Sequence, residues 1–360
     1  MLTVDTLPAY LLEERLIAPD AVLDGDLEVV TRSRRNRNLR VTWSQGGFLV
    51  KQPEEAAGPA GETLRREAAL YAYVQGDERL TALRPFLPPV VRARPEAGVL
   101  VLGLLRDAVP LWTHYERSTA ARFPVETAAE VGRALARVHH AFAGAEPDFL
   151  PDALPWAFAL HRPSPSVRAG VSRAALEVVR IVQADAEMVA AVDTAAAGWR
   201  ADSVVHGDVK LDNVLVREDG GGVCLVDWEL VQLGDAAWDV AGALHDFLVW
   251  WIVTMPQAPT VEEMAERARF PLPALQPGIA ALWRGYRDAA RAGEPPAAIL
   301  RRAVPYVGVR LVQTAYEMAA NVHALPAPSV LALQVAWHVL RDPEAALEGL
   351  MGIGAGEVRT

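Results

Sequence analysis

One short polar stretch of this sequence combines residue types and a spacing that suit catalysis. Residues 206–213 read HGDVKLDN, and Asp227 follows after a further short run. Apolar, largely β-branched runs at 204–206, 214–216 and 223–226 flank these residues, so we expect the polar side chains to lie in loops at the ends of strands. A carboxylate, an amide and a second carboxylate are therefore gathered within a short length of chain.

These residue types suit the transfer of a phosphoryl group. Asp208 could accept the proton of an attacking hydroxyl group, because a carboxylate can act as a general base. Asn213 and Asp227 offer hard oxygen ligands of the kind that hold Mg²⁺ on nucleotide phosphates. The chemistry implied is phosphoryl transfer from a nucleotide to an alcohol.

The motif at 206–208, with Asn213 five residues after the Asp and Asp227 further on, resembles the catalytic and metal-binding loops of the aminoglycoside phosphotransferase family. That family shares the protein-kinase-like fold. The resemblance covers roughly residues 27–255 and implies ATP and Mg²⁺ as cofactors.

The same resemblance implies an α+β, bilobal, protein-kinase-like fold. Residues 1–102 would form a small N-lobe with a five-stranded antiparallel sheet and one helix. Residues 103–105 would form a hinge, and residues 106–360 a larger, mostly helical C-lobe that carries the catalytic and metal loops. The length independently favours two lobes or domains over a single compact unit.

The composition is that of a globular protein whose main partner is not a nucleic acid. Hydrophobic residues make up 51% and charged residues 22%, which argues against extensive disorder. The net charge of −10 argues against a nucleic-acid partner and leaves cationic substrates open. A secretory signal is not indicated, and the most apolar stretch, 247–255, is too short to span a bilayer. We therefore expect a cytoplasmic protein without a membrane partner, and a buried, unpaired Cys224.

Three strands are expected after a short helix at 6–16. Their β-rich runs are Leu27–Thr31, Leu39–Trp43 and Phe48–Gln52. Lys51 then falls near the end of the third strand, where its ammonium group could pair with the α- and β-phosphates of ATP. A lysine at the end of a strand is also often a solvated edge residue.

A helix is expected at 62–74, where apolar residues recur at helical spacing. Glu67 lies beside its apolar stripe. In the family a Lys/Glu pair orients the phosphate-binding lysine, so the resemblance implies that Glu67 holds Lys51. The alternative is an exposed helical glutamate.

The loop between the first two strands lacks the glycine-rich turn of kinases. Residues 32–38 read RSRRNRN. Asn tolerates left-handed backbone conformations and Arg can donate hydrogen bonds to phosphate directly, so the loop could still cover ATP. Ser33, Asn36 and Asn38 are the candidates to contact the nucleotide. A solvated basic turn, or a site for an acidic partner, remains an alternative.

Two further strands, at 90–93 and 98–102, would complete the sheet. The residues that follow, Gly103, Leu104 and Leu105, resemble the hinge at which backbone groups bind the adenine edge. The same residues could instead form a buried strand and turn.

Eight helices are expected in the remainder of the chain: 125–142, 172–182, 186–197, from about 235 to about 253, 261–268, 280–292, 297–319 with a kink or break at Pro305, and 329–340. Of the adjacent His139 and His140, one should be packed and one exposed. The region 143–199 is a plausible part of the acceptor site. Arg301, Arg302 and Arg310 could face an anionic group, but residues of this type more often lie on a solvated helix face, which is what we expect here.

Three more residues of the central stretch and its surroundings have expected roles. Lys210 could reach the γ-phosphate and neutralise charge during transfer, as the lysine of Ser/Thr kinases does at this position. His206 is expected to brace the loop. The resemblance implies that Asp239 accepts hydrogen bonds from the backbone of the loop.

The acceptor is open at this stage. The family favours a hydroxyl of a small molecule such as an aminoglycoside-like antibiotic or a metabolite. Lys210 and the Arg/Asn loop leave open a kinase that phosphorylates Ser/Thr of a precursor peptide before elimination by a partner lyase, as in lanthipeptide and thioamitide maturation. An ATP-binding pseudokinase scaffold is the third possibility.

Overall fold

The chain folds into two compact units, which we describe separately. The structure is a computed structural model that describes residues 1–31, 37–53, 58–143, 147–163, 171–256, 258, 260–290 and 294–358. Unit 1 comprises Met1–Val109, Pro147–Leu150 and Leu215–Val231, and unit 2 comprises Pro110–Glu146, Pro151–Val214 and Gln232–Thr360. This division differs from the expected lobes, because residues 215–231 belong to the first unit.

Unit 1 is built on the predicted five-stranded antiparallel sheet, which is confirmed. Its strands are β1 (Glu28–Thr31), β2 (Arg37–Trp43), β3 (Gly46–Gln52), β4 (Val90–Arg94) and β5 (Val99–Gly103), in the order β1-β2-β3-β5-β4. In β2 and β3, Asn38 lies opposite Lys51. Directly opposed residues of an antiparallel pair project from the same face, so these two side chains share one face of the sheet.

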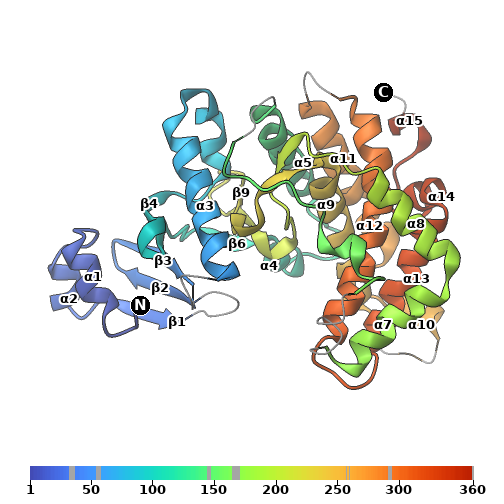
Figure 1. The fold of residues 1–360 in the computed structure, drawn as a ribbon, viewed down its shortest axis with the longest axis horizontal. Helices are drawn as coiled ribbons and strands as arrows, with labels where there is room; N and C mark the ends of the chain where they lie inside the picture. The colour runs from blue at the N-terminus through green and yellow to red at the C-terminus, as the bar shows by residue number, and fades with distance from the viewer. Residues whose placement is uncertain are drawn as a thin grey trace. The chain divides into compact units, whose positions relative to one another are not determined.

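Helices cover both faces of this sheet (Figure 1). They are α1 (Leu7–Glu13), α2 (Asp20–Leu23) and α3 (Pro59–Gly76), with the 3₁₀ segments η1 (Glu78–Phe86) and η2 (Pro95–Ala97). Leu7 and Leu11 of α1 are fully buried in a core with Val41 and Val50. The first helix ends earlier than predicted, because Arg15 adopts a left-handed conformation with φ 56°.

A second, three-stranded sheet explains why residues 215–231 belong to unit 1. It is formed by β6 (Ala108–Pro110), β8 (Val214–Arg217) and β9 (Val223–Leu225), in the order β6-β8-β9. Glu218 N–H also donates to Asp107 O at 2.7 Å. The short 3₁₀ segment η5 (Trp228–Leu230) follows directly after Asp227.

Unit 2 is mostly helical, as predicted. Its helices are α4 (Leu111–Glu116), α5 (Val125–Ala141), α7 (Arg173–Ala184), α8 (Ala186–Ala197), α9 (Ala236–Thr254), α10 (Val261–Glu266), α11 (Leu272–Ala289), α12 (Pro296–Ala319), α13 (Ala327–Arg341), α14 (Pro343–Gly349) and α15 (Ala355–Val358). Two 3₁₀ segments, η3 (Trp156–Ala159) and η4 (Leu211–Asn213), and the antiparallel pair β7 (Ser203–Val205) and β10 (Gln232–Gly234) complete it. None of the described helices combines the length and the apolar character needed to cross a membrane.

Two predictions about the late helices are corrected. Helix α12 continues through Pro305, so the helix has no break there, and the kink stays a prediction. It packs against α7, α9 and α13, and this packing holds the helix together where proline removes one backbone hydrogen bond. Helix α11 begins at Leu272, earlier than predicted, because Pro277 lies inside the helix rather than before it.

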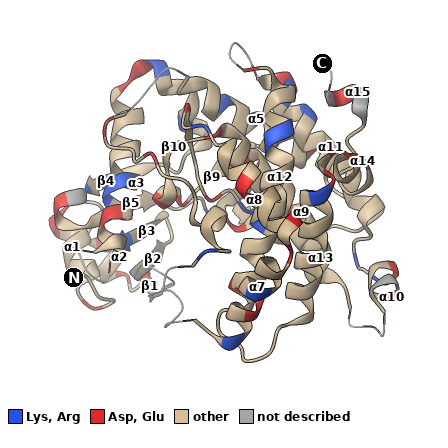
Figure 2. Ribbon diagram, turned by 45° about the vertical axis from the view of Figure 1, so that its right-hand side comes forward, with Lys and Arg blue, Asp and Glu red and all other residues tan. Residues whose placement is uncertain are grey.

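Helix α9 lies in the interior of unit 2. Only two of its 19 residues are charged, Asp239 and Asp246, and most of its side chains are buried. The ribbon of α9 is accordingly mostly tan in Figure 2. Burying a carboxylate is costly unless it is hydrogen-bonded or paired. Both carboxylates indeed receive hydrogen bonds from the loop that contains Asp208.

Candidate active site

Unit 1 holds a buried cluster of opposite charges around Lys51. The Lys51 Nζ atom lies 2.9 and 2.8 Å from the two carboxylate oxygens of Glu67, and 2.6 Å from Asp227 Oδ1. The side chains of Lys51 and Glu67 are 3% and 0% exposed, whereas that of Asp227 is 38% exposed. Strand β3 and helix α3 thus present an ion pair whose cation also reaches the more accessible Asp227.

The charge of Lys51 is secured by its partners. Burial acts to lower the pKa of this ammonium group, but the carboxylates of Glu67 and Asp227 outweigh it and raise the pKa above its usual value. Lys51 therefore stays cationic at any physiological pH, which a phosphate-binding lysine requires.

Two features of this cluster were not predicted from the sequence. Tyr71, one turn after Glu67 on α3, donates its hydroxyl hydrogen to Glu67 Oε1 at 2.9 Å. The i, i+4 spacing of these two residues is visible in the sequence, but it does not distinguish a hydrogen-bond donor from an apolar core residue. Asp227 adopts a left-handed backbone conformation with φ 67° and ψ 56°, which Asp tolerates better than most residues.

The candidate nucleotide contacts in the first loop are only partly described. Ser33 and Asn36 lie outside the described residues. Asn38 shares the face of Lys51, and its Oδ1 atom is buried without a hydrogen-bond partner in the described part of the chain. An unsatisfied buried amide costs free energy, so a polar ligand beside Lys51 would fit this position.

The expected hinge residues are partly engaged within unit 1. Gly103 N–H donates to Pro89 O at 2.7 Å, and Leu104 N–H donates to Gly47 O at 2.9 Å. These two backbone donors are therefore already used within unit 1.

The hinge residues Gly103 to Leu105 also line a pocket of about 490 Å³ with Trp43 and Phe48. Phe48 and Trp43 pack with the core beneath α1. Phe48 is an odd number of residues from Lys51 on β3, so their side chains lie on opposite faces of the sheet. This pocket is therefore not built around Lys51.

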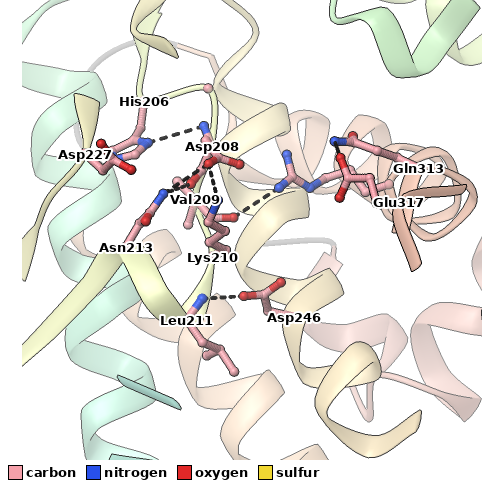
Figure 3. A network of polar contacts seen from close by, with 12 residues as sticks. His206, Asp208, Val209, Lys210, Leu211, Asn213, Asp227, Asp246, Gln313 and Glu317 are labelled. Atoms are coloured by element: carbon pink, nitrogen blue, oxygen red, sulfur yellow. Dashed lines mark hydrogen bonds and ion pairs between the residues drawn. The ribbon is translucent and has the colours of Figure 1, made fainter. Parts of the chain in front are cut away.

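In unit 2, the backbone of the central loop is anchored on Asp239 (Figure 3 shows the loop). The N–H groups of His206 and Gly207 donate to the two carboxylate oxygens of Asp239, at 2.7 and 3.0 Å. His139 also contacts Asp239, with Nε2 3.1 Å from Oδ2. Although burial alone would raise it, the pKa of Asp239 is lowered by His139 and by the loop around His206.

The loop also holds the side chain of Asp208 in place. Asp208 Oδ2 accepts from Lys210 Nζ at 2.5 Å and from Asn213 Nδ2 at 3.1 Å (Figure 3). The same Asn213 amide donates to Asp208 O at 2.9 Å. His206 Nδ1 accepts from the Asp208 N–H at 3.3 Å, which matches its expected bracing position. Since the NH₂ group of Asn213 faces Asp208, its carbonyl oxygen is the atom suited to bind a cation.

Residues from outside the motif complete the support of this loop. Trp238 donates its indole N–H to Gly207 O at 3.0 Å, Asp246 accepts from the Leu211 N–H, and Arg310 donates to Val209 O at 3.2 Å. The expectation that Arg310 lies on a solvated face is wrong, because this residue is 5% exposed. Arg302 is also not solvated: it pairs with Asp235 and Glu294.

The sequence matches the model of a known protein family. The model of the phosphotransferase enzyme family matches residues 26–287. The chain therefore belongs to this phosphotransferase family, and the predicted relationship to aminoglycoside phosphotransferases and the predicted phosphotransferase activity are confirmed. A search of curated proteins gave no match.

Solved structures with the same fold cover nearly the whole chain. A protein of Ralstonia eutropha described as an aminoglycoside phosphotransferase is 15% identical, with 95% of this chain and 97% of that chain covered and a TM-score of 0.53. A microcompartment-associated aminopropanol kinase is 15% identical, with 91% and 94% covered and a TM-score of 0.51. An ethanolamine kinase of Plasmodium vivax is 11% identical, with 91% and 85% covered and a TM-score of 0.51. At these identities the likeness shows the protein-kinase-like fold.

Proposed function

We propose that the protein is an ATP- and Mg²⁺-dependent kinase that transfers the γ-phosphate of ATP to a hydroxyl group of a small molecule. The observation that carries this proposal is the arrangement of Asp208. Lys210 and Asn213 both bind its Oδ2 atom, which orients Oδ1 to accept the proton of an acceptor hydroxyl.

The other candidate residues have complementary proposed roles. Lys51, held by Glu67, binds the α- and β-phosphates of ATP, and Asn213 and Asp227 supply oxygen ligands for Mg²⁺. Mg²⁺, when bound, neutralises charge on the phosphates. Lys210, which lies beside Asp208, provides positive charge where the phosphoryl group is transferred.

The small-molecule acceptor is proposed to be an amino alcohol. Two of the structural relatives are, by name, kinases of aminopropanol and ethanolamine, which both carry an amine and a hydroxyl group. The net charge of −10 favours a cationic over an anionic acceptor. Both points support the choice of amino alcohols and aminoglycosides as the first compounds to test.

The test is ADP release together with the mass of the product. The protein would be incubated with ATP and Mg²⁺ and a panel of amino alcohols, aminoglycosides and Ser/Thr-containing peptides. We expect an amino alcohol or aminoglycoside to gain one phosphate group. Phosphorylation of a peptide alone would favour the peptide-modifying alternative, and nucleotide binding without transfer or hydrolysis would favour a pseudokinase.

A further inference from the structure

One face of α9 carries the loop that contains Asp208. Asp239, Gly242 and Asp246 are spaced by three and four residues, so they lie along one side of the helix. Asp239 and Asp246 bind loop N–H groups at either end of the contact. Between them, a Cβ atom on Gly242 would lie 2.7 Å from Val209 O, so the loop approaches as closely as glycine allows.

A second helix, α12, reaches the same loop through Arg310. Its Nη2 atom donates to Val209 O at 3.2 Å, and its guanidinium group lies over the ring of Trp238 at 4.9 Å. Trp238 in turn donates to Gly207 O. Arg310 and its stacking partner therefore bind the carbonyl groups on both sides of Asp208.

The burial of Arg310 costs desolvation free energy, so a purely stabilising role does not account for an arginine at this position. It is 5% exposed, and its Nε atom has no hydrogen-bond partner within the described ranges. A buried guanidinium group that leaves a donor unsatisfied loses hydration without full compensation. A methionine of similar length would fill the same space with a smaller desolvation cost. What methionine could not supply is the hydrogen bond from Arg310 to Val209 O.

One turn further along α12, Thr314 reaches the loop through two α9 residues. His245 Nε2 lies 2.8 Å from Thr314 Oγ1, and His245 Nδ1 lies 3.1 Å from Asp246 Oδ1. Burial lowers the pKa of His245, so the ring is neutral and its single N–H donates to the carboxylate. The Thr314 hydroxyl group then donates to Nε2, and the other oxygen of Asp246 accepts from Leu211 N–H.

We propose that α12 is a second support of the catalytic loop, in which Arg310 and Thr314 fix the backbone on either side of Lys210 and Arg310 acts as a positioning residue for Asp208. Arg310 donates to Val209 O, directly before Lys210. The hydrogen-bonded series from Thr314 through His245 and Asp246 holds the N–H group of Leu211, directly after Lys210. The side chain of Lys210 binds Asp208, so fixing the backbone around Lys210 also fixes the position of the Asp208 carboxylate. The proposal rests on the proposed role of Asp208.

The test combines backbone exchange with kinetics in Arg310→Met and Arg310→Lys. Hydrogen exchange would be followed in peptides that cover residues 206–213, and hydrolysis of ATP with Mg²⁺ would be measured without an added acceptor. Arg301→Met is the matched control, because Arg301 lies on the same helix and is exposed. Arg310→Met should raise exchange in this segment and lower kcat by about 10²-fold with little change in the KM for ATP, because a small displacement of a catalytic group costs that much.

Arg310→Lys keeps the charge and should recover part of the loss, whereas Arg301→Met should behave as wild type. Wild-type exchange of residues 206–213 in folded Arg310→Met would overturn the proposal, as would equal losses in KM and kcat. If Arg310→Met does not fold, Thr314→Val replaces it, with raised exchange expected at Leu211. Raised exchange in Arg310→Met, together with a wild type that neither hydrolyses ATP nor transfers its phosphate to any acceptor of the panel, would leave the positioning intact and contradict the proposed function instead.

Discussion

At the scale of single residues, the two oppositely charged pairs of the site differ in their exposure to solvent. Lys51 and Glu67 are almost completely buried, so removing one partner leaves an uncompensated charge. Lys210 and Asp208 are 39% and 21% exposed, so water can replace a lost partner there. Substitutions in unit 1 should therefore affect folding and nucleotide binding together, and those at Lys210 chiefly turnover.

Glu67→Gln tests the first of these environments. The change keeps the shape but removes the charge that faces Lys51, so we expect the KM for ATP to rise by about 10-fold and the protein to lose about 3 kcal/mol of stability. Glu62→Gln, on the same helix at an exposed position, is the control. ATP titrations and urea unfolding would measure both effects, and equal behaviour of the two variants would contradict the assigned role.

The pH dependence of stability follows from the buried histidine His245. Burial lowers its pKa below the usual 6.5, against the opposing effects of Asp246 and Glu317 and in the same direction as Arg310. The unfolded chain then binds a proton more readily than the folded chain below about pH 6.5, so stability is highest above that pH and falls as the pH is lowered.

Urea unfolding at about pH 7.5 and about pH 5.5 would measure this difference, and His245→Gln should reduce it. A wild-type protein that becomes more stable between these two pH values as acid is added would contradict the assignment of a neutral, buried His245.

The helices show why local sequence patterns predicted some parts of the site and not others. The loop 206–213, and the pair formed by β3 and α3, lie in short segments with strong local patterns. Within the loop the structure joins Asn213 to Asp208, and within the pair it joins Lys51 to Glu67. Arg310 is 101 residues from Val209, and its contact depends on how α12 packs beside α9. No local pattern distinguishes this arginine from the exposed Arg301 on the same helix.

Gly242→Ala tests the close approach of the loop to α9. In a helix interior this change alone would stabilise by about 0.5–1 kcal/mol, but the new Cβ atom would meet Val209 O at 2.7 Å. We expect a displaced loop and a loss of turnover of about 10²-fold, with the helix retained. Gly349→Ala, where nothing lies within 4 Å, is the control in turnover and circular dichroism measurements. Wild-type turnover in Gly242→Ala would show that the loop tolerates displacement.

At the level of the whole molecule, the sequence predicted the fold class well and the limits of the units less well. The motif at 206–213, with Asp227, indicated the family, which the match to the family model confirms. The period of the apolar residues located most helices and strands. The grouping of residues 215–231 with unit 1 depends on pairing between β6 and β8, which are far apart in the sequence. Such pairing is not encoded in any one segment.

Binding of nucleotide should stabilise the whole protein. If ATP and Mg²⁺ bind the folded chain alone, a ligand concentration 100 times Kd adds about 2.7 kcal/mol to the free energy of unfolding. We expect a higher Tm with ATP and Mg²⁺, a smaller shift when EDTA removes the metal, and little shift in Lys51→Met. An equal shift with and without EDTA would contradict the proposed role of Asn213 and Asp227 as metal ligands.

The most direct test of the central claim is the turnover of Asp208→Asn with ATP and Mg²⁺. Because asparagine cannot take the proton of the attacking hydroxyl group, we predict that kcat falls by about 10²–10⁴-fold while the affinity for ATP stays close to that of wild type. Asp288→Asn, at an exposed position on α11, should leave both unchanged. Wild-type turnover in Asp208→Asn would contradict the assignment of Asp208 as the base, and with it the proposed mechanism.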